Sequence, residues 1–345
     1  MSKKSGCLFA FLVFILFLSF ALNLGLWAMR SGGGESTLGT GHAAPLRKFG
    51  EKTLVNGTAA GGAKIVQIDL DGIISSMSSE GLFFEALPDM HTIKRQIEQA
   101  VADANVKAIV LRINSPGGEV TASDVLYNSV KKAATVKPVI VHMDSMAASG
   151  GYYVACGATK IVASETTLTA SIGVIIETLN YSDLFGKVGL GMQTFTSGAF
   201  KDSLSGARPM RDDEKAYVQN LVNQMYERFL GIVSEARKVP ADQLRSTVAD
   251  GRVVTGREAL AAKLVDQIGY IEDAYTLARD LGKAADAPVV RYHRESGFLE
   301  TLLEAAKPGN APRASTRLEL SVGGAPMMPR LQPGVPYYLS TSYAR

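Results

Sequence analysis

Residues 144–153 read Asp-Ser-Met-Ala-Ala-Ser-Gly-Gly-Tyr-Tyr, and an apolar run at 138–141 leads into them. This order predicts a buried strand, a tight turn and then a helix, with Ser149 where the turn meets the helix. A helix N-terminus offers unpartnered backbone N–H groups and favours negative charge. Gly150 and Gly151 would let a substrate backbone come close. Ser149 is therefore either an ordinary helix cap or a nucleophile that builds an oxyanion.

Strand–turn–helix units repeat around this stretch. The residue pattern predicts strands at 65–70, 108–113, 139–143 and 160–163, with 171–175 continuing the series, and helices at 90–105, up to 132 and up to 155. Strands that alternate with helices predict an α/β fold with right-handed crossovers and a largely parallel sheet. Ligands of such sheets bind at the carboxyl ends of the strands, where the serine turn and the turn at 114–118 both fall. The turn at 114–118, Asn-Ser-Pro-Gly-Gly, is either structural punctuation or a second source of oxyanion donors.

A short N-terminal tail, 1–6, precedes an almost wholly apolar run of 23 residues at 7–29. As a helix this run would span about 34 Å, enough for a bilayer core of about 30 Å. Lys3 and Lys4 come before it and Arg30 follows. We expect an uncleaved transmembrane anchor with the bulk of the chain outside the cytoplasm, and a cleaved signal peptide is the alternative.

The composition divides the rest of the chain into three parts. Residues 30–62 are rich in Gly, Ser, Thr and Ala, which predicts a flexible linker. Residues 63–283 are expected to form the folded domain, and 284–345 a C-terminal extension. Six prolines lie between 308 and 345, which favours disorder there. The alternative is that 318–322 adds a strand and the tail docks on the domain or on a neighbour.

Charge and composition exclude several classes of function. The net charge is only +3 and there is no basic stripe, so we expect no nucleic-acid partner. No group of Cys, His and carboxylate residues has metal-ligand spacing, so we expect no metal and no cofactor. The two cysteines, Cys7 and Cys156, lie in separate parts of the chain, so we expect no disulfide.

A nucleophilic serine needs a base, and none of the four histidines is in a suitable setting. His142 lies inside a predicted strand, where packing explains it better than catalysis. A lysine can serve as base when desolvation brings its pKa toward neutrality. Lys201 lies among apolar and small residues at 195–202. Its alternative interpretation is a surface lysine paired with Asp202. The helix predicted at 212–237 carries an apolar stripe that is either core or subunit interface.

Six segments, in this order, resemble the signal peptide peptidase A family of membrane-anchored Ser/Lys proteases, within the wider Clp/crotonase superfamily. They are N-S-P-G-G at 114–118, D-S-M-A-A-S-G-G-Y-Y at 144–153, T-A-S-I-G-V at 169–174, Y-S-D-L-F-G-K-V-G at 181–189, S-G-A-F-K-D at 197–202 and D-G-R-V-V-T-G at 250–256. The resemblance covers roughly residues 64–283.

The resemblance implies a role for each matched position. Ser149 would be the nucleophile and Lys201 the general base. The backbone N–H groups of Gly150 and of Gly117 or Gly118 would form the oxyanion hole. Ser171 would orient the lysine amine. The resemblance also implies repeated β-β-α units and a homo-oligomeric ring or dome in which subunits cooperate to build each site.

The expected function is a serine endopeptidase that degrades cleaved signal peptides in or near the membrane. The chain would pass the inner (cytoplasmic) membrane once, contact lipid through 7–29, and keep its catalytic domain on the extracytoplasmic side. The alternatives are a protease that cuts one membrane-protein partner, and a non-catalytic scaffold on a crotonase-like fold. An acyl-CoA enzyme of that superfamily is a weaker rival, because the anchor and Lys201 have no clear use there.

Overall fold

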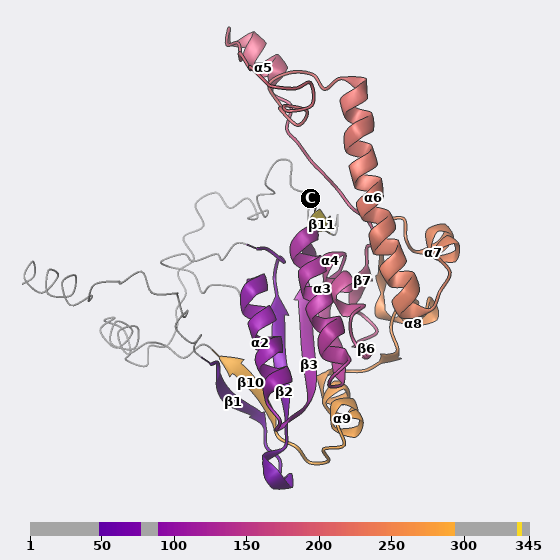
Figure 1. Ribbon diagram of the computed structural model, residues 1–345. Helices are drawn as coiled ribbons and strands as arrows, with labels where there is room; N and C mark the ends of the chain where they lie inside the picture. Colours follow the sequence, from indigo (N-terminus) through magenta and orange to yellow (C-terminus); the bar gives the residue numbers. More distant parts are fainter. Residues whose placement is uncertain (1–47, 77–88, 294–336, 340–345) are drawn as a thin grey trace, which may run out of the picture. The chain divides into compact units, whose positions relative to one another are not determined.

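A nine-stranded, largely parallel sheet forms the centre of the computed structural model, which describes residues 48–76, 89–293 and 337–339 (Figure 1). The strands run in the order β1-β10-β2-β3-β5-β6-β9, and β7 and β8 extend the sheet from β5. Their bounds are β1 Gly50–Val55, β2 Lys64–Asp71, β3 Val106–Ser115, β5 Val139–Ala148, β6 Lys160–Ala163, β7 Leu168–Ala170, β8 Val253–Thr255, β9 Gln267–Ile268 and β10 Val289–His293. Only the β1–β10 and β7–β8 pairs are antiparallel within this sheet, so the predicted parallel α/β architecture is confirmed.

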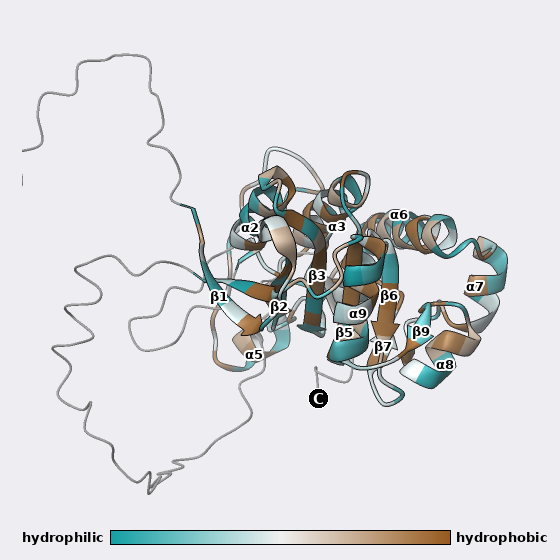
Figure 2. Cartoon of the chain, turned by 90° about the horizontal axis from the view of Figure 1, so that it is seen from below, coloured by the Kyte–Doolittle hydropathy of each residue, from teal (hydrophilic) through white to brown (hydrophobic). Residues whose placement is uncertain are grey.

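Helices cover both faces of the sheet. Their bounds are α2 Met90–Ala102, α3 Val120–Ala134, α4 Gly150–Ala155, α5 Ser182–Lys187, α6 Asp212–Arg237, α7 Ala241–Thr247, α8 Gly256–Ala261 and α9 Ile271–Leu281, with a short 3-10 turn at Ala60–Gly62. One apolar core joins the sheet to α2, α3, α4 and the end of α6, and a second joins the opposite face to α9. Apolar residues accordingly dominate the central strands (Figure 2). The chain thus buries an apolar layer on each side of its sheet.

Strand β5 is longer than its apolar run predicts. It was expected to end at Met143, but it continues to Ala148 because β7 pairs with its second half in the register Met146–Leu168 to Ala148–Ala170. The prediction of a strand at 171–175 is also wrong. The strand in this region is β7, which ends at Ala170. The small, fully buried side chains of Ala147 and Ala148 let this extension run through the interior.

The sheet reaches beyond both boundaries expected for the folded domain. Strand β1 lies within 30–62, the stretch predicted to be linker, and β10 lies within the predicted C-terminal extension. Strand β10 pairs with the edge of β2, and β1 pairs with the outer edge of β10. Each strand supplies partners for backbone groups that its neighbour would otherwise leave unpaired.

The predicted membrane anchor at 7–29 lies outside the described residues. Among the residues that the structure does describe, no helix is both long and apolar enough to cross a membrane.

Helix α6 has the predicted bounds, but only its C-terminal part joins the core. Phe229, Leu230, Ile232 and Val233 are buried, whereas most of the helix before them is exposed or half-buried. The segment 176–211, which carries α5, lies beyond the N-terminal end of α6 and away from the sheet (Figure 1). We call this segment the arm. Large apolar side chains stay exposed along it: Leu179, Leu184, Val188, Leu190, Met192 and Phe195.

A second, two-stranded sheet joins the turn at 114–118 to the C-terminal part of the chain. Strand β4, Gly117–Glu119, pairs antiparallel with β11, Tyr337–Leu339. The expected strand at 318–322 lies outside the described residues. Residues 337–339 are the one described part of the predicted tail, and docking of the tail as a whole stays a prediction.

Candidate active site

Ser149 occupies a strained turn between β5 and α4. Its backbone angles, φ 53° and ψ −114°, are a sparsely populated combination for a residue with a side chain. The residue is fully buried, and its hydroxyl has no hydrogen-bond partner among the described residues. A buried hydroxyl left without a partner costs free energy, so an unpaired one indicates a role other than stability. Ser149 Oγ is therefore a candidate nucleophile.

Two glycine segments meet beside this serine. A Cβ atom on Gly150 would lie 3.1 Å from the backbone nitrogen of Gly118, so the backbones of these two segments are in direct contact. A Cβ atom on Gly118 would lie 2.0 Å from the carbonyl oxygen of Ile74, which excludes every side chain there. These close approaches require glycine at both positions. They bring the backbone of 117–118 and the first turn of α4 together next to Ser149.

The hydrogen bonds of β4 show which of the two candidate donors, Gly117 or Gly118, has an available N–H group. The N–H of Gly117 donates to Ser115 Oγ at 3.1 Å. Ile74 donates to the Gly117 carbonyl, and Glu119 donates to the Ile74 carbonyl, each at 2.9 Å. Backbone groups alternate in direction along a strand, so the N–H and carbonyl of Gly118 face away from Ile74, on the side where β11 runs. This geometry favours Gly118 over Gly117 as a donor to a bound carbonyl.

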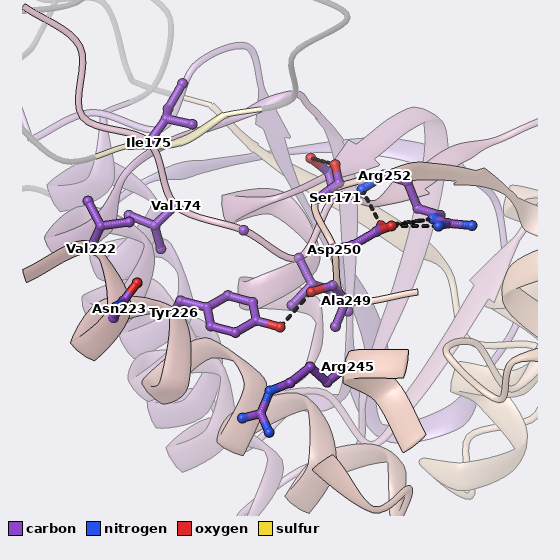
Figure 3. Close-up of a pocket in the computed structure, with 13 residues that line it drawn as sticks. Ser171, Val174, Ile175, Val222, Asn223, Tyr226, Arg245, Ala249, Asp250 and Arg252 are labelled. Carbon is purple, nitrogen blue, oxygen red and sulfur yellow. Dashed lines mark hydrogen bonds and ion pairs between the residues drawn. The ribbon is translucent and has the colours of Figure 1, made fainter. Parts of the chain in front are cut away.

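Ser171 lies at the end of the strand that pairs with the serine turn. The N–H of Ser149 donates to the carbonyl of Ala170 at 2.7 Å, and Ser171 is the next residue after this acceptor. Ser171 itself has a positive φ of 51°, and its hydroxyl donates to the Gly251 carbonyl at 3.2 Å. It is 3% exposed and borders a groove of about 650 Å³ between the chain after β7, α6 and the loop before β8 (Figure 3).

Ser123, on α3, is a neighbour of the site that the sequence analysis did not single out. Its hydroxyl lies 2.5 Å from the position that a Cβ of Gly150 would take. It is fully buried and, like Ser149 Oγ, has no partner in the described part of the chain. No local sequence signal marks it, because α3 reads as an ordinary amphipathic helix.

The first turn of α4 is anchored to two other helices. The Tyr153 hydroxyl donates to Asp124 of α3 at 2.6 Å, and Arg228 of α6 donates to the same carboxylate oxygen at 2.9 Å. The ring of Tyr153 also packs on Phe229, with ring centroids 4.9 Å apart. The turn that carries Ser149 is therefore fixed by packing and hydrogen bonds on its far side.

Lys201 is not next to Ser149 within one chain. The Phe200 ring contacts Tyr217 near the N-terminal end of α6, with centroids 5.3 Å apart. The α4 helix contacts the same helix α6 at Phe229 instead. Phe229 follows Tyr217 by twelve positions in the helix, which is about 18 Å along the helix axis. The structure therefore brings together Ser149, Gly117, Gly118, Gly150 and Ser171, and leaves Lys201 exposed on the arm.

His142 and Asp144 both lie in β5, seven and five residues before Ser149. Neither ring nitrogen of His142 has a hydrogen-bond partner among described residues, and burial lowers its pKa. His142 shares a strand face with Ile140, which packs toward α9, on the opposite side of the sheet from α4. Asp144 lies within the strand, and its carboxylate accepts a hydrogen bond from Arg112 Nε at 3.0 Å.

Comparison with known proteins identifies the family of the chain. The profile of peptidase family S49 matches residues 131–285, and that of Clp protease matches 89–170. A candidate signal peptide peptidase SppA of Enterococcus faecium is 36% identical over 255 residues, which are 73% of each chain. Protease 4 of Salmonella typhi is 37% identical over 216 residues, 62% of this chain and 34% of that protein. A solved point mutant of ClpP1 from Listeria monocytogenes has a TM-score of 0.40 and 17% identity, over 60% of this chain and 93% of that one.

Proposed function

The chain belongs to the signal peptide peptidase SppA family, peptidase family S49, and from this premise we propose that it is a serine endopeptidase with a Ser149–Lys201 dyad. The observation that carries the proposal is the buried, unpartnered hydroxyl of Ser149 in its strained turn beside Gly118 and Gly150. Such a turn presents a nucleophile to a carbonyl that two backbone N–H groups can polarise.

The proposed reaction is acyl transfer. The neutral amine of Lys201 takes the proton of Ser149 Oγ as this oxygen attacks the scissile carbonyl. The carbonyl oxygen becomes an oxyanion that accepts from the N–H groups of Gly118 and Gly150. The lysine ammonium then gives its proton to the leaving amine, and the C–N bond breaks. Water, deprotonated by Lys201, cleaves the acyl-Ser149 ester, and Ser171 holds the amine in line.

The substrate is proposed to bind as an added strand on β4. The outward N–H and carbonyl of Gly118 lie on the side of β4 along which β11 runs antiparallel. Addition of a strand to such an edge recognises the backbone of an extended peptide. We therefore propose unfolded, extended peptides as the substrate class. Cleaved signal peptides fit this class better than a single membrane-protein partner does.

Lys201 is proposed to act on Ser149 of a second copy of the chain. About 18 Å of α6 separates the Lys201 end of the helix from the α4 end. The exposed apolar side chains of the arm would be buried by such a neighbour, as large exposed apolar patches usually are. The half-buried stripe in the first part of α6 is proposed to belong to the same interface. A ring or dome of copies, anchored through 7–29 on the extracytoplasmic side, would place all sites together.

Mixed oligomers test this proposal. The full chain in detergent micelles would be assayed with a fluorogenic hydrophobic signal-sequence peptide as Ser149→Ala, as Lys201→Ala, and after coexpression of both. Each variant alone is expected to lose at least about 1,000-fold in kcat/KM. Coexpression should restore a measurable part, because a Ser149 from one copy meets a Lys201 from the other.

The control is Lys187→Ala, an exposed lysine of the same arm, which should keep wild-type activity. Near-normal activity of Lys201→Ala would show that the base is wrong. Mixed oligomers that assemble and stay inert would rule out the exchange between copies.

A further inference from the structure

Arg208 binds two carboxylates beside the proposed base. Its Nε and Nη2 atoms donate to Asp202 at 3.0 and 2.8 Å. Its Nη1 and Nη2 atoms donate to Glu214, in the first turn of α6, at 2.9 and 2.6 Å. The side chain of Glu214 is fully buried. Such paired donors fix the geometry of an arginine–carboxylate contact far better than a single bond does.

These contacts fix the loop that carries Lys201. Arg211 donates to the carbonyl of Ala199 at 2.9 Å and also pairs with Glu214 at 3.0 Å. The loop is therefore tied to α6 just before Lys201, through Ala199, and just after it, through Asp202. The segment keeps a defined shape although it lies away from the main core.

The charges around Lys201 are matched without it. The acidic groups near the loop are Asp202, Asp212, Asp213 and Glu214. Arg208 and Arg211 pair with Asp202, Asp213 and Glu214, and Lys215 pairs with Asp212. The hydrogen bond from Arg208 is also the main cause of a lowered pKa for Asp202. In the part of the chain that the structure describes, the Lys201 amine makes no ion pair. Lys201 is exposed, as the sequence-based alternative has it, but Asp202 pairs with Arg208 and not with Lys201.

A carboxylate adjacent to a lysine normally favours the charged ammonium, which cannot accept a proton. We propose that Arg208 is a positioning residue for catalysis: it binds the Asp202 carboxylate and so leaves the neighbouring Lys201 amine without a counter-ion. This inference rests on the proposed role of Lys201. It adds that the last part of the arm, 197–211, is built to keep its one lysine, Lys201, available as a base.

The test compares pH profiles of kcat/KM for the full chain, with the same fluorogenic peptide. Arg208→Gln releases Asp202 and should move the acidic limb of the profile to higher pH by about one unit, a loss of about tenfold on that limb. Asp202→Asn alone should leave the limb in place. The double variant should return the limb to its wild-type position, because the released carboxylate is gone.

A second background separates this effect from damage to the buried ion pair. Arg208→Gln in a Glu214→Gln background leaves no unpaired buried carboxylate, and there too the limb should move upward relative to Glu214→Gln alone. An unmoved limb in both backgrounds, or a shift that Asp202→Asn does not reverse, overturns the inference. Lys201→Ala separates failure of the proposed function from failure of this inference. Full activity of Lys201→Ala would contradict the proposed function. An inactive Lys201→Ala together with an unmoved acidic limb in Arg208→Gln would contradict only the role of Arg208.

Discussion

The backbone N–H of Ser149 donates a 2.7 Å hydrogen bond to the carbonyl of Ala170, and both residues have a positive φ, 53° and 62°. Each conformation is disfavoured for a residue with a Cβ atom, by about 1–2 kcal/mol. The pairing of β5 with β7 holds them, since Ala148 is in register with Ala170 immediately before the bond. The sheet therefore stabilises a turn that the local sequence disfavours.

Replacement of Ser149 by glycine should release this strain. We expect Ser149→Gly to raise the free energy of unfolding by about 1 kcal/mol while peptidase activity falls to background, because glycine adopts positive φ freely. Urea unfolding and the peptide assay measure the two effects. Lys238→Gly is the matched control, since Lys238 caps α6 with φ 53° and lies outside the site. It should gain similar stability and keep activity. A Ser149→Gly variant that is less stable than wild type would contradict the strain argument.

The contact between Gly118 and Ile74 makes a second prediction. A methyl group at Gly118 would lie 2.0 Å from the Ile74 carbonyl oxygen, so β4 must shift in Gly118→Ala. Displacement of an oxyanion donor should lower kcat by about 100-fold. Gly231→Ala is the control, because nothing lies within 4 Å of the position its Cβ would take in α6. It should add up to about 1 kcal/mol of stability and leave kcat unchanged. Equal kcat values for the two variants would remove Gly118 from the site.

Strand β11 covers the edge of β4 and should compete with substrates for it. A chain that ends at Pro336 lacks β11, whereas a chain that ends at Leu339 keeps it. We expect the shorter chain to have a kcat/KM for short peptides roughly tenfold higher, because a tethered strand has a high effective concentration at its own site. Identical kinetics of the two truncated chains would show that β11 does not compete for this edge.

The buried carboxylate of Glu214 predicts a pH dependence of local stability. Hydrogen bonds from Arg208 are the main cause that lowers its pKa to about 2, below about 4.3 for an unfolded glutamate. A group whose folded pKa is depressed stabilises the folded state above its unfolded pKa. That stability is lost as the pH falls toward the folded value. Hydrogen-exchange protection of residues 212–220, corrected for intrinsic rates, should therefore decline from pH 5 to pH 2.

In Glu214→Gln the same protection should be lower at pH 7 and change less with pH. Asp213→Asn, which removes a neighbouring carboxylate that is 57% exposed, should behave as wild type. An unchanged pH dependence in Glu214→Gln would assign the effect to another group.

Much of the sheet could be predicted from the sequence because the signal for a buried strand is local. The apolar runs at 65–70, 108–113 and 160–163 each became strands, and the 212–237 helix has the predicted bounds. Strand β1 could not be predicted, since Gly50–Val55 is largely polar and is ordered by pairing with β10 more than 230 residues later. The extension of β5 could not be predicted for the same reason, because pairing with β7, and not local composition, sets the end of the strand.

The sequence by itself determined which residues are candidates for the site, through motifs that resemble one protease family. The motifs at 114–118, 144–153 and 197–202 propose a serine, glycine donors and a lysine without any knowledge of distance. Only the tertiary structure decided how these parts are distributed. It places Ser149, Gly118 and Gly150 together. It leaves Lys201 at the other end of α6, where Arg208 binds the carboxylate of the adjacent Asp202. The physical reason is that backbone propensity and side-chain chemistry act over a few residues, whereas the meeting of two sites depends on contacts between residues far apart in the chain.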